Sequence, residues 1–212
     1  MADFRIPPPH TPIPPSSHQL ESSEQNKKTA RLEEFDFLRI KIEQFIIMAS
    51  YDPQIFEDVF IQITNLKELM YSNILNADQE NIIISEMSEL DSELNSGSTK
   101  IKNLHDRIFQ FNTNLEETFP KIKAFNIIQS LKNNLCISPV DDLPPMDIKE
   151  FKDLEKDVLS FIRKDIENFR INKLFSTLKV ISENFLYHPR RNYSETVNQL
   201  KQVVNDIRNG II

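Results

Sequence analysis

Glycine, tryptophan and cysteine are scarce in this sequence of 212 residues, which has two glycines, no tryptophan and one cysteine. At the average usage of about 7%, a chain of this length would hold about 15 glycines. Phosphate-binding loops and dinucleotide-binding turns each need at least two glycines in one short loop, and Gly97 and Gly210 lie far apart. The scarcity argues against nucleotide-binding folds, and against α/β barrels and β-sandwiches, whose turns need many glycines.

Disulfides, basic charge and long apolar runs are also missing. The single cysteine, Cys136, allows no intramolecular disulfide, which indicates a reducing compartment. The formal net charge of −7 argues against nucleic acid or an anionic membrane as the main partner, because both attract clustered basic residues. We find neither a secretory signal pattern nor an apolar run approaching about 18 residues. We therefore expect a cytoplasmic protein without a membrane span, and leave open the nucleus or secretion into a host cell.

Proline is concentrated at the start of the chain. Six of the 12 prolines lie in the first 15 residues, and a polar Ser/Gln/Glu segment follows them. Because proline fixes φ and removes an amide donor, we predict that residues 1–26 form an extended proline-rich flexible arm. Pro9, Pro12 and Pro15 have the PxxP spacing that aromatic grooves of SH3-type modules bind, although the usual basic anchor is missing. The alternatives are a solvated spacer, a strip laid on a partner subunit, or an export signal.

Helical periodicity governs the rest of the chain. From Ala30 onward, apolar residues recur at alternating spacings of three and four, which is typical of helices and not of strands. The sequence therefore predicts an all-α protein, an elongated helical bundle or a set of coiled-coil-like hairpins with about six helices. Residues 27–135 are predicted to hold four of the six helices. Hydrophobic residues at 39% are sufficient for a substantial core.

Local signals mark the ends of these four helices. Proline opens a helix well, so Asp52-Pro53 is predicted to separate the first helix from the second. Asn76 followed by Gln79 predicts a capping box at the start of the third helix. Gly97 predicts a left-handed C-cap and a hairpin between the third and fourth helices. The heptad frame of the fourth helix runs through Pro120, which predicts a kink there and not a domain boundary.

The C-terminal third is predicted to be a linker followed by two helices. Residues 136–146 hold three prolines and form the linker. Residues 147–212 are predicted to form one helix of about 40 residues, which would span about 60 Å, and a last helix that begins at Asn192 with Glu195 completing its cap. The last helix repeats apolar residues in heptads, which is compatible with a coiled coil, so we take five of them as candidate protein-binding residues: Tyr193, Val197, Leu200, Val204 and Ile207.

Charge patterning adds a prediction about packing. The segment from Asp78 to Glu93 holds six carboxylates and no basic residue, whereas the following segment carries Lys100, Lys102 and Arg107. We predict that the acidic and basic helices neutralise each other as an antiparallel hairpin. The alternatives for the acidic segment are a solvated face and an electrostatic docking surface for a basic partner.

Chemistry-bearing residues form no recognisable constellation. The helical histidines lack a metal-binding companion at the required spacing, and Cys136 has no cationic neighbour in sequence, so it is interpreted as a packed thiol. An enzyme built in a helical bundle would show inward Glu and Glu-x-x-His pairs, and none is present. We assign no catalytic, cofactor-binding or metal-binding residue and expect no enzymatic activity.

The leading functional hypothesis is a non-enzymatic helical interaction or scaffold protein, a subunit of a larger assembly. Its partners would be other protein subunits, themselves helical, in a homo- or hetero-oligomer. The hypothesis rests partly on apolar residues outside the main stripes, which must be buried in a multi-helix core or against a partner: Ile46, Ile47 and Met48 beside Phe45, and Ile82 and Ile84 beside Ile83. The alternative is a bacterial effector exported through a contact-dependent secretion system and acting on host proteins.

Overall fold

The computed structural model of the protein describes residues 17–49, 53–97, 101–137, 145–164 and 167–212. Over these residues the chain is helical, with no strand, which confirms the all-α prediction. The prediction of about six helices was too low, because the described residues form eight α-helices and a short π-helix. In chain order they are α1 (Ser17–Ala49), α2 (Pro53–Tyr71), α3 (Ala77–Ser96), α4 (Ile101–Thr118), α5 (Pro120–Lys132), the π-helix η1 (Asn133–Ile137), α6 (Ile148–Arg163), α7 (Asn168–Tyr187) and α8 (Pro189–Arg208).

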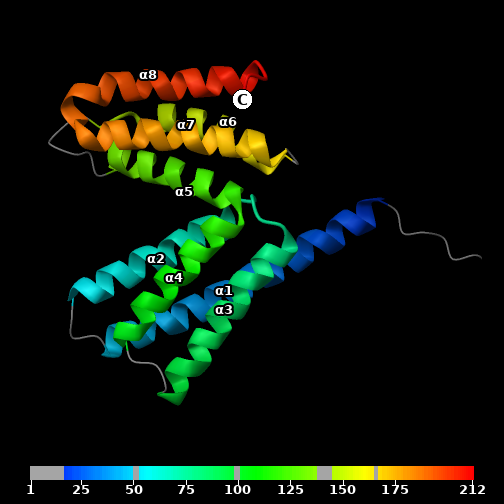
Figure 1. The fold of residues 1–212 in the computed structure, drawn as a ribbon. Coiled ribbons are helices and arrows are strands. Elements are labelled where there is room, and N and C mark those ends of the chain that lie inside the picture. The colour runs from blue at the N-terminus through cyan, green and yellow to red at the C-terminus, as the bar shows by residue number, and fades with distance from the viewer. Residues whose placement is uncertain (1–16, 50–52, 98–100, 138–144, 165–166) are drawn as a thin grey trace, which may run out of the picture.

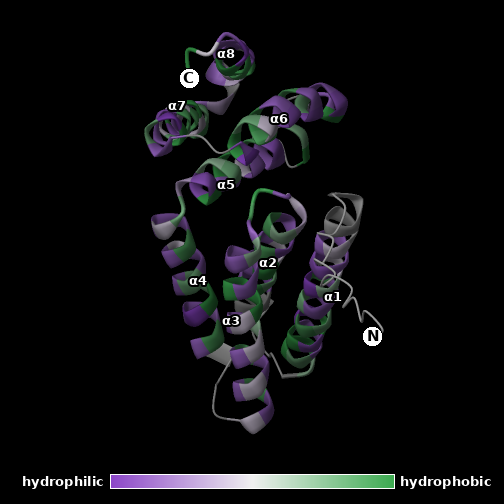
Figure 2. Ribbon diagram, turned by 90° about the vertical axis from the view of Figure 1, so that its right-hand side faces the viewer, coloured by the Kyte–Doolittle hydropathy of each residue, from purple (hydrophilic) through white to green (hydrophobic). Residues whose placement is uncertain are grey.

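The helices divide into two groups that meet at the junction between α4 and α5 (Figure 1). In the first group α1 packs against α3 and α2, and α2 packs against α4. In the second group α5 packs against α7 and α6, and α8 packs against α7 and α6. One continuous apolar core contains side chains from all eight α-helices. In the view of Figure 2, α5 to α8 lie above the first group, and α1 forms one edge of it.

The first helix is longer than the sequence predicted. It begins at Ser17, so residues 17–26, which we assigned to the flexible arm, are helical, and that part of the prediction was wrong. A helix propagates more easily than it nucleates, and the later turns of α1 are held by ion pairs, for example between Lys28 and Glu80. Residues 1–16 lie outside the described residues, and so do the predicted arm prolines Pro9, Pro12 and Pro15.

Local capping signals were predicted correctly. α2 begins at Pro53. In the capping box of α3, the Gln79 backbone amide donates to Asn76 Oδ1 at 2.9 Å, and the Asn76 amide donates to Gln79 Oε1 at 3.1 Å. Gly97 ends α3 in the left-handed conformation, with φ of 69°, and its amide donates to the Leu94 carbonyl at 3.1 Å. These features depend on residues within one helical turn of one another.

Replacing Gly97 with alanine is expected to lower the free energy of unfolding by about 1 kcal/mol, because an L side chain is strained at positive φ. No atom lies within 4 Å of the position that the new Cβ would take, so the cost comes from the backbone alone. Urea unfolding followed by circular dichroism measures the change. Asparagine tolerates this conformation better, so Gly97→Asn is the matched control with the smaller loss. Equal stability of Gly97→Ala and the parent chain would contradict the prediction.

The chain breaks at Pro120, where the sequence predicted a kinked helix along one shared seam. Helix α4 ends at Thr118, Phe119 is extended with φ of −123° and ψ of 98°, and Pro120 opens α5. A residue before proline avoids the helical region, and proline suits the first helical position. The two halves also pack on different helices, since α4 packs mainly on α2 whereas α5 packs mainly on α7 and α6. The kink prediction was therefore wrong.

The single long helix predicted after the linker was also wrong. Helix α6 ends at Arg163, Lys164 is extended with ψ of 152°, and α7 starts at Asn168. Arg163 donates from Nε and Nη2 to the Ser72 carbonyl oxygen at 3.1 and 2.7 Å, which fixes the end of α6 on the turn after α2. A contact between residues so far apart in sequence leaves no local signal.

The last helix begins at Pro189, three residues before the predicted start. His188 is its N-cap position and makes no side-chain capping bond. Asn192, which we predicted to be the cap, lies within α8, and its Nδ2 donates to the Asn184 carbonyl at 2.7 Å. The predicted Asn192–Glu195 cap was therefore wrong, because proline at the first helical position starts the helix earlier.

Both described ends of the predicted linker 136–146 are held against the fold. Cys136 belongs to the π-helix η1. Met146 is buried, and its amide donates to the Leu135 carbonyl at 2.7 Å. Residues 138–144 lie outside the described part of the chain. Among the described helices, none is both long enough and apolar enough to cross a membrane.

Candidate protein-binding surface

The heptad face of α8, which supplied the predicted binding residues, points into the chain's own core. Leu200 and Val204 are each only 2% exposed, so neither side chain is available to a partner on the folded chain. The other three predicted residues are partly buried against the same core: Tyr193, Val197 and Ile207. Because α8 packs against α7 and α6, this face holds the C-terminal helices together.

The helix α1 has a second apolar face that the described chain leaves uncovered. Phe37 is 62% exposed, Ile40 43%, Ile47 60% and Met48 77%. At 100° per residue these side chains and Gln44 lie on the side of α1 opposite its buried residues. We call these five residues the outer α1 face. Figure 2 shows α1 at the edge of the first helix group.

The inner face of α1 fixes how the helix is oriented. Phe35, Ile42 and Ile46 are fully buried, and α3 is the helix that α1 contacts most. Lys41 pairs with Asp91 of α3. The inner face is packed in the core, and Lys41 on the side of the helix is paired with α3. A rotation of α1 that turned the outer face inward would therefore lose the core contacts.

A hydrogen-bonded group connects α1 to α2. The Tyr71 hydroxyl donates to Asp36, and Arg39 donates from Nε to the same carboxylate at 3.0 Å. Partial burial acts to raise the pKa of Asp36, but the hydrogen bonds from Tyr71 and Arg39 outweigh it and lower this pKa. The same bond to Asp36 raises the pKa of the Tyr71 hydroxyl. The group is a structural connection between the two helices.

The buried carboxylate Glu80 of α3 pairs with two cations of α1. Its side chain is 1% exposed, and it is paired with Arg31 Nε at 2.6 Å and with Lys28 Nζ at 2.9 Å. A buried charge is tolerated only when it is paired and hydrogen-bonded. Two cations on one carboxylate satisfy that requirement, so this cluster stabilises the α1–α3 contact.

The acidic stretch of α3 gathers around one arginine of α4. Arg107 donates to Glu86 at 2.8 Å, to Glu89 at 3.1 Å, and also to Glu93. Burial opposes the charged form, but the hydrogen bonds that Arg107 donates to Glu93 and Glu86 outweigh it and raise the pKa of Arg107. The predicted pairing of acidic with basic residues therefore occurs at Arg107. The predicted close packing of the two helices as a hairpin was wrong, because α3 packs mainly on α1 and α4 packs mainly on α2. The side chains of Lys100 and Lys102 lie outside the described residues.

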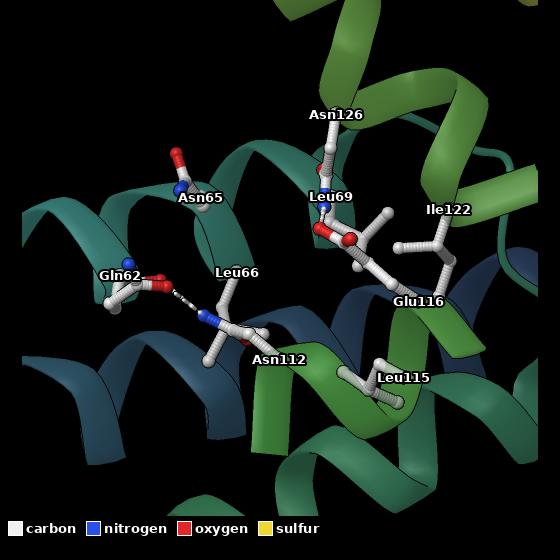
Figure 3. A pocket seen from close by; sticks show the side chains of 9 residues that line it. All are labelled: Gln62, Asn65, Leu66, Leu69, Asn112, Leu115, Glu116, Ile122 and Asn126. Carbon is white, nitrogen blue, oxygen red and sulfur yellow. Dashed lines mark hydrogen bonds between the residues drawn. The ribbon is translucent and has the colours of Figure 1, made fainter. Parts of the chain in front are cut away.

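A small polar pocket lies where α2, α4 and α5 meet (Figure 3). Asn112 Nδ2 donates to Gln62 Oε1 at 2.7 Å, and Asn126 Nδ2 donates to Glu116 Oε1 at 2.6 Å. The cavity measures about 30 Å³, which suits about one water molecule. The bond between Asn126 and Glu116 joins the two helix groups, whereas the bond between Asn112 and Gln62 lies within the first group. The space is too small for a substrate.

An open apolar groove runs between α7 and α8. It measures about 500 Å³, and Val180, Ile181 and Val203 supply its apolar lining. Gln199, Gln202 and Asp206 are among its polar residues. Across the residues that the structure describes, no three His, Cys, Asp or Glu side chains converge so that they could hold a metal ion.

The thiol of Cys136 is partly buried, as the sequence suggested. Burial raises the pKa of this thiol, although Lys132 acts in the opposite direction. We expect iodoacetamide to alkylate Cys136 at pH 7 at least about threefold more slowly than it alkylates free cysteine, because only the thiolate reacts. The rate should rise as the pH passes above the ordinary thiol pKa. Mass spectrometry of time points gives the rate, and alkylation faster than free cysteine would contradict a packed thiol.

The outer α1 face was missed as a unit by the sequence analysis. Ile47 and Met48 were noted as lying off the main stripe, but Phe37 and Ile40 were not. The signal is a second run at spacings of three and four through residues 30, 33, 37, 40, 44 and 47.

No known protein family, curated protein or solved structure shows a significant match to this chain. The candidate surface is therefore identified from the chain's own packing.

Proposed function

We propose that this chain is a non-enzymatic helical interaction protein, a subunit of a larger protein assembly, and that it binds a partner helix through the outer α1 face. The observation that supports this most is that Phe37, Ile40, Ile47 and Met48 are exposed together on one side of a helix whose opposite side is packed. Single exposed apolar residues are ordinary in monomers, whereas a contiguous apolar patch marks an interaction site.

The shape of the face suits a helical partner. From Phe37 to Met48 it extends for about 16 Å along the helix axis. Its residues follow the spacing by which helices anchor in grooves and in coiled coils. Lys41 lies over the Phe37 ring, with Nζ 5.2 Å from the ring centroid, so a cation borders the aromatic anchor. An apolar centre with a charged border is the usual anatomy of a protein interface.

Site-specific photo-crosslinking in the cells that make the protein tests this proposal. A photoreactive amino acid replaces Gln44, which is exposed in the middle of the outer α1 face, and the matched control replaces Lys152, which is exposed on α6. We expect a discrete crosslinked protein from position 44 and none from position 152. Adding Phe37→Glu to the position-44 variant should abolish the product. The same products from both positions would contradict binding at this face.

A further inference from the structure

We infer that a second copy of this chain covers the outer α1 face, with the two α1 helices packed antiparallel. The inference rests on the proposed function, because it identifies the partner of that same face. It is argued from self-complementarity. When two copies of the face run in opposite directions, large residues of one copy lie opposite small or apolar residues of the other, and polar residues lie opposite polar residues.

Four of the five residues of the outer α1 face, all except Met48, belong to a longer run that has the frame of a coiled-coil seam. Residues 30, 33, 37, 40, 44 and 47 alternate in spacing between three and four and extend over about 26 Å. Three of them are large and exposed, namely Phe37, Ile40 and Ile47. The remaining positions are Ala30, Glu33 and Gln44, all exposed. A seam of this kind is buried when a second helix packs along it.

The seams of two antiparallel copies are complementary when the two-fold axis passes midway between Phe37 and Ile40. In that register Phe37 faces Ile40 of the second copy, and the small Ala30 faces the large Ile47. Glu33 faces Gln44, whose amide can donate to the carboxylate. A parallel arrangement would instead place Glu33 opposite Glu33, which like-charge repulsion disfavours.

Charges beside the seam favour the same arrangement. Glu34 and Lys41 lie on one flank of the seam, about two turns apart along the helix. Antiparallel packing places Glu34 of each copy near Lys41 of the other copy, which also pairs with Asp91 of its own chain. On the opposite flank Asp36 and Glu43 of the two copies approach each other. Both are already paired with Arg39, at 3.0 and 2.8 Å, which reduces their repulsion.

Sedimentation equilibrium of the purified full chain tests for the second copy. We expect a monomer–dimer equilibrium in the parent chain and, in Phe37→Glu, a dissociation constant raised by about 100-fold or more, because two symmetry-related anchors are lost. Phe169→Glu is the matched control, since Phe169 on α7 is 65% exposed, and it should leave the dissociation constant unchanged. Circular dichroism checks that both variants remain folded. Equal weakening by both substitutions would overturn the inference.

Cysteine crosslinking tests the antiparallel arrangement. Glu33→Cys and Gln44→Cys are placed in separate chains, each with Cys136→Ser, and the two proteins are mixed in equal amounts. Antiparallel packing predicts that mild oxidation links a Glu33→Cys chain to a Gln44→Cys chain, with little linkage of like chains. Positions 33 and 44 are about 16 Å apart along one helix, so parallel packing would give only like-chain products. That result would overturn the inferred arrangement.

The two proposals fail in different ways. A chain that stays monomeric at high concentration while position 44 crosslinks to a different protein overturns the second-copy inference and supports the proposed function. A monomeric chain whose position 44 gives no specific crosslink overturns both. Crosslinking of position 44 to a second copy of the chain, together with the dimer in solution, supports both.

Discussion

Replacing Phe35 with alanine is expected to lower the free energy of unfolding by about 4 kcal/mol, which is a large part of the stability of a typical domain. Phe35 is fully buried on the inner face of α1, among the largest completely enclosed side chains. Its removal forfeits the burial of the ring and leaves a cavity that the surrounding helices fill only partly. The substitution should therefore loosen the whole α1–α3 contact.

Phe37, two residues further along the same helix, is the matched control. It is 62% exposed on the outer α1 face, so Phe37→Ala should change the stability of the monomer by no more than about 0.5 kcal/mol. Because the chain has no tryptophan, urea unfolding is best followed by far-ultraviolet circular dichroism, at a protein concentration low enough to keep the chain monomeric. Equal losses for the two phenylalanines would contradict the assignment of inner and outer faces.

Replacing Glu80 with alanine is expected to destabilise the fold by about 3 kcal/mol. The carboxylate is 1% exposed and forms ion pairs with Arg31 and Lys28, whose side chains are 17% and 22% exposed. Removing it leaves two partly buried cations without their counter-charge, and loss of one partner of a buried pair is costly. The effect should be largest on the helical residues before Phe35, since these two cations tie that segment of α1 to α3.

Two control substitutions separate the charge of Glu80 from its position on α3. Glu80→Gln keeps the size of the side chain and one hydrogen-bond acceptor, so it should cost less than Glu80→Ala. Glu89→Ala removes a carboxylate that is 64% exposed, although it also contacts an arginine; surface ion pairs contribute little, so the loss should stay below about 1 kcal/mol. Urea unfolding of all three variants is the measurement. A loss at Glu89 as large as that at Glu80 would contradict the buried-anchor interpretation.

Helix type and most helix starts in the first half could be predicted from the sequence. The capping box at Asn76 and the left-handed cap at Gly97 require only residues within one helical turn, so their outcome is decided locally. The start of α2 at Pro53 has the same local origin. The sequence failed where a local signal was absent or misleading, as at the end of α6, where Arg163 bonds to the distant Ser72 carbonyl.

The choice of interaction surface was the harder problem. The heptad residues of α8 and the residues of the outer α1 face have the same spacing, so periodicity does not distinguish a helix that packs inside its own chain from one that presents an outer face. In the structure Leu200 and Val204 are enclosed, whereas Phe37 and Ile40 are exposed. The place of each helix in the tertiary fold decides whether its apolar stripe is buried or exposed.

The sequence by itself determined that this protein is helical and where several of its helices are capped, because helix formation depends on contacts three and four residues apart. Only the tertiary structure decided which apolar stripes are buried. A helix such as α1 has apolar residues on two sides, and the side that is buried is the one that reaches the larger enclosed area when all helices pack together. Burial depends on contacts between residues far apart in the chain, and the spacing of residues along one helix contains no information about those contacts.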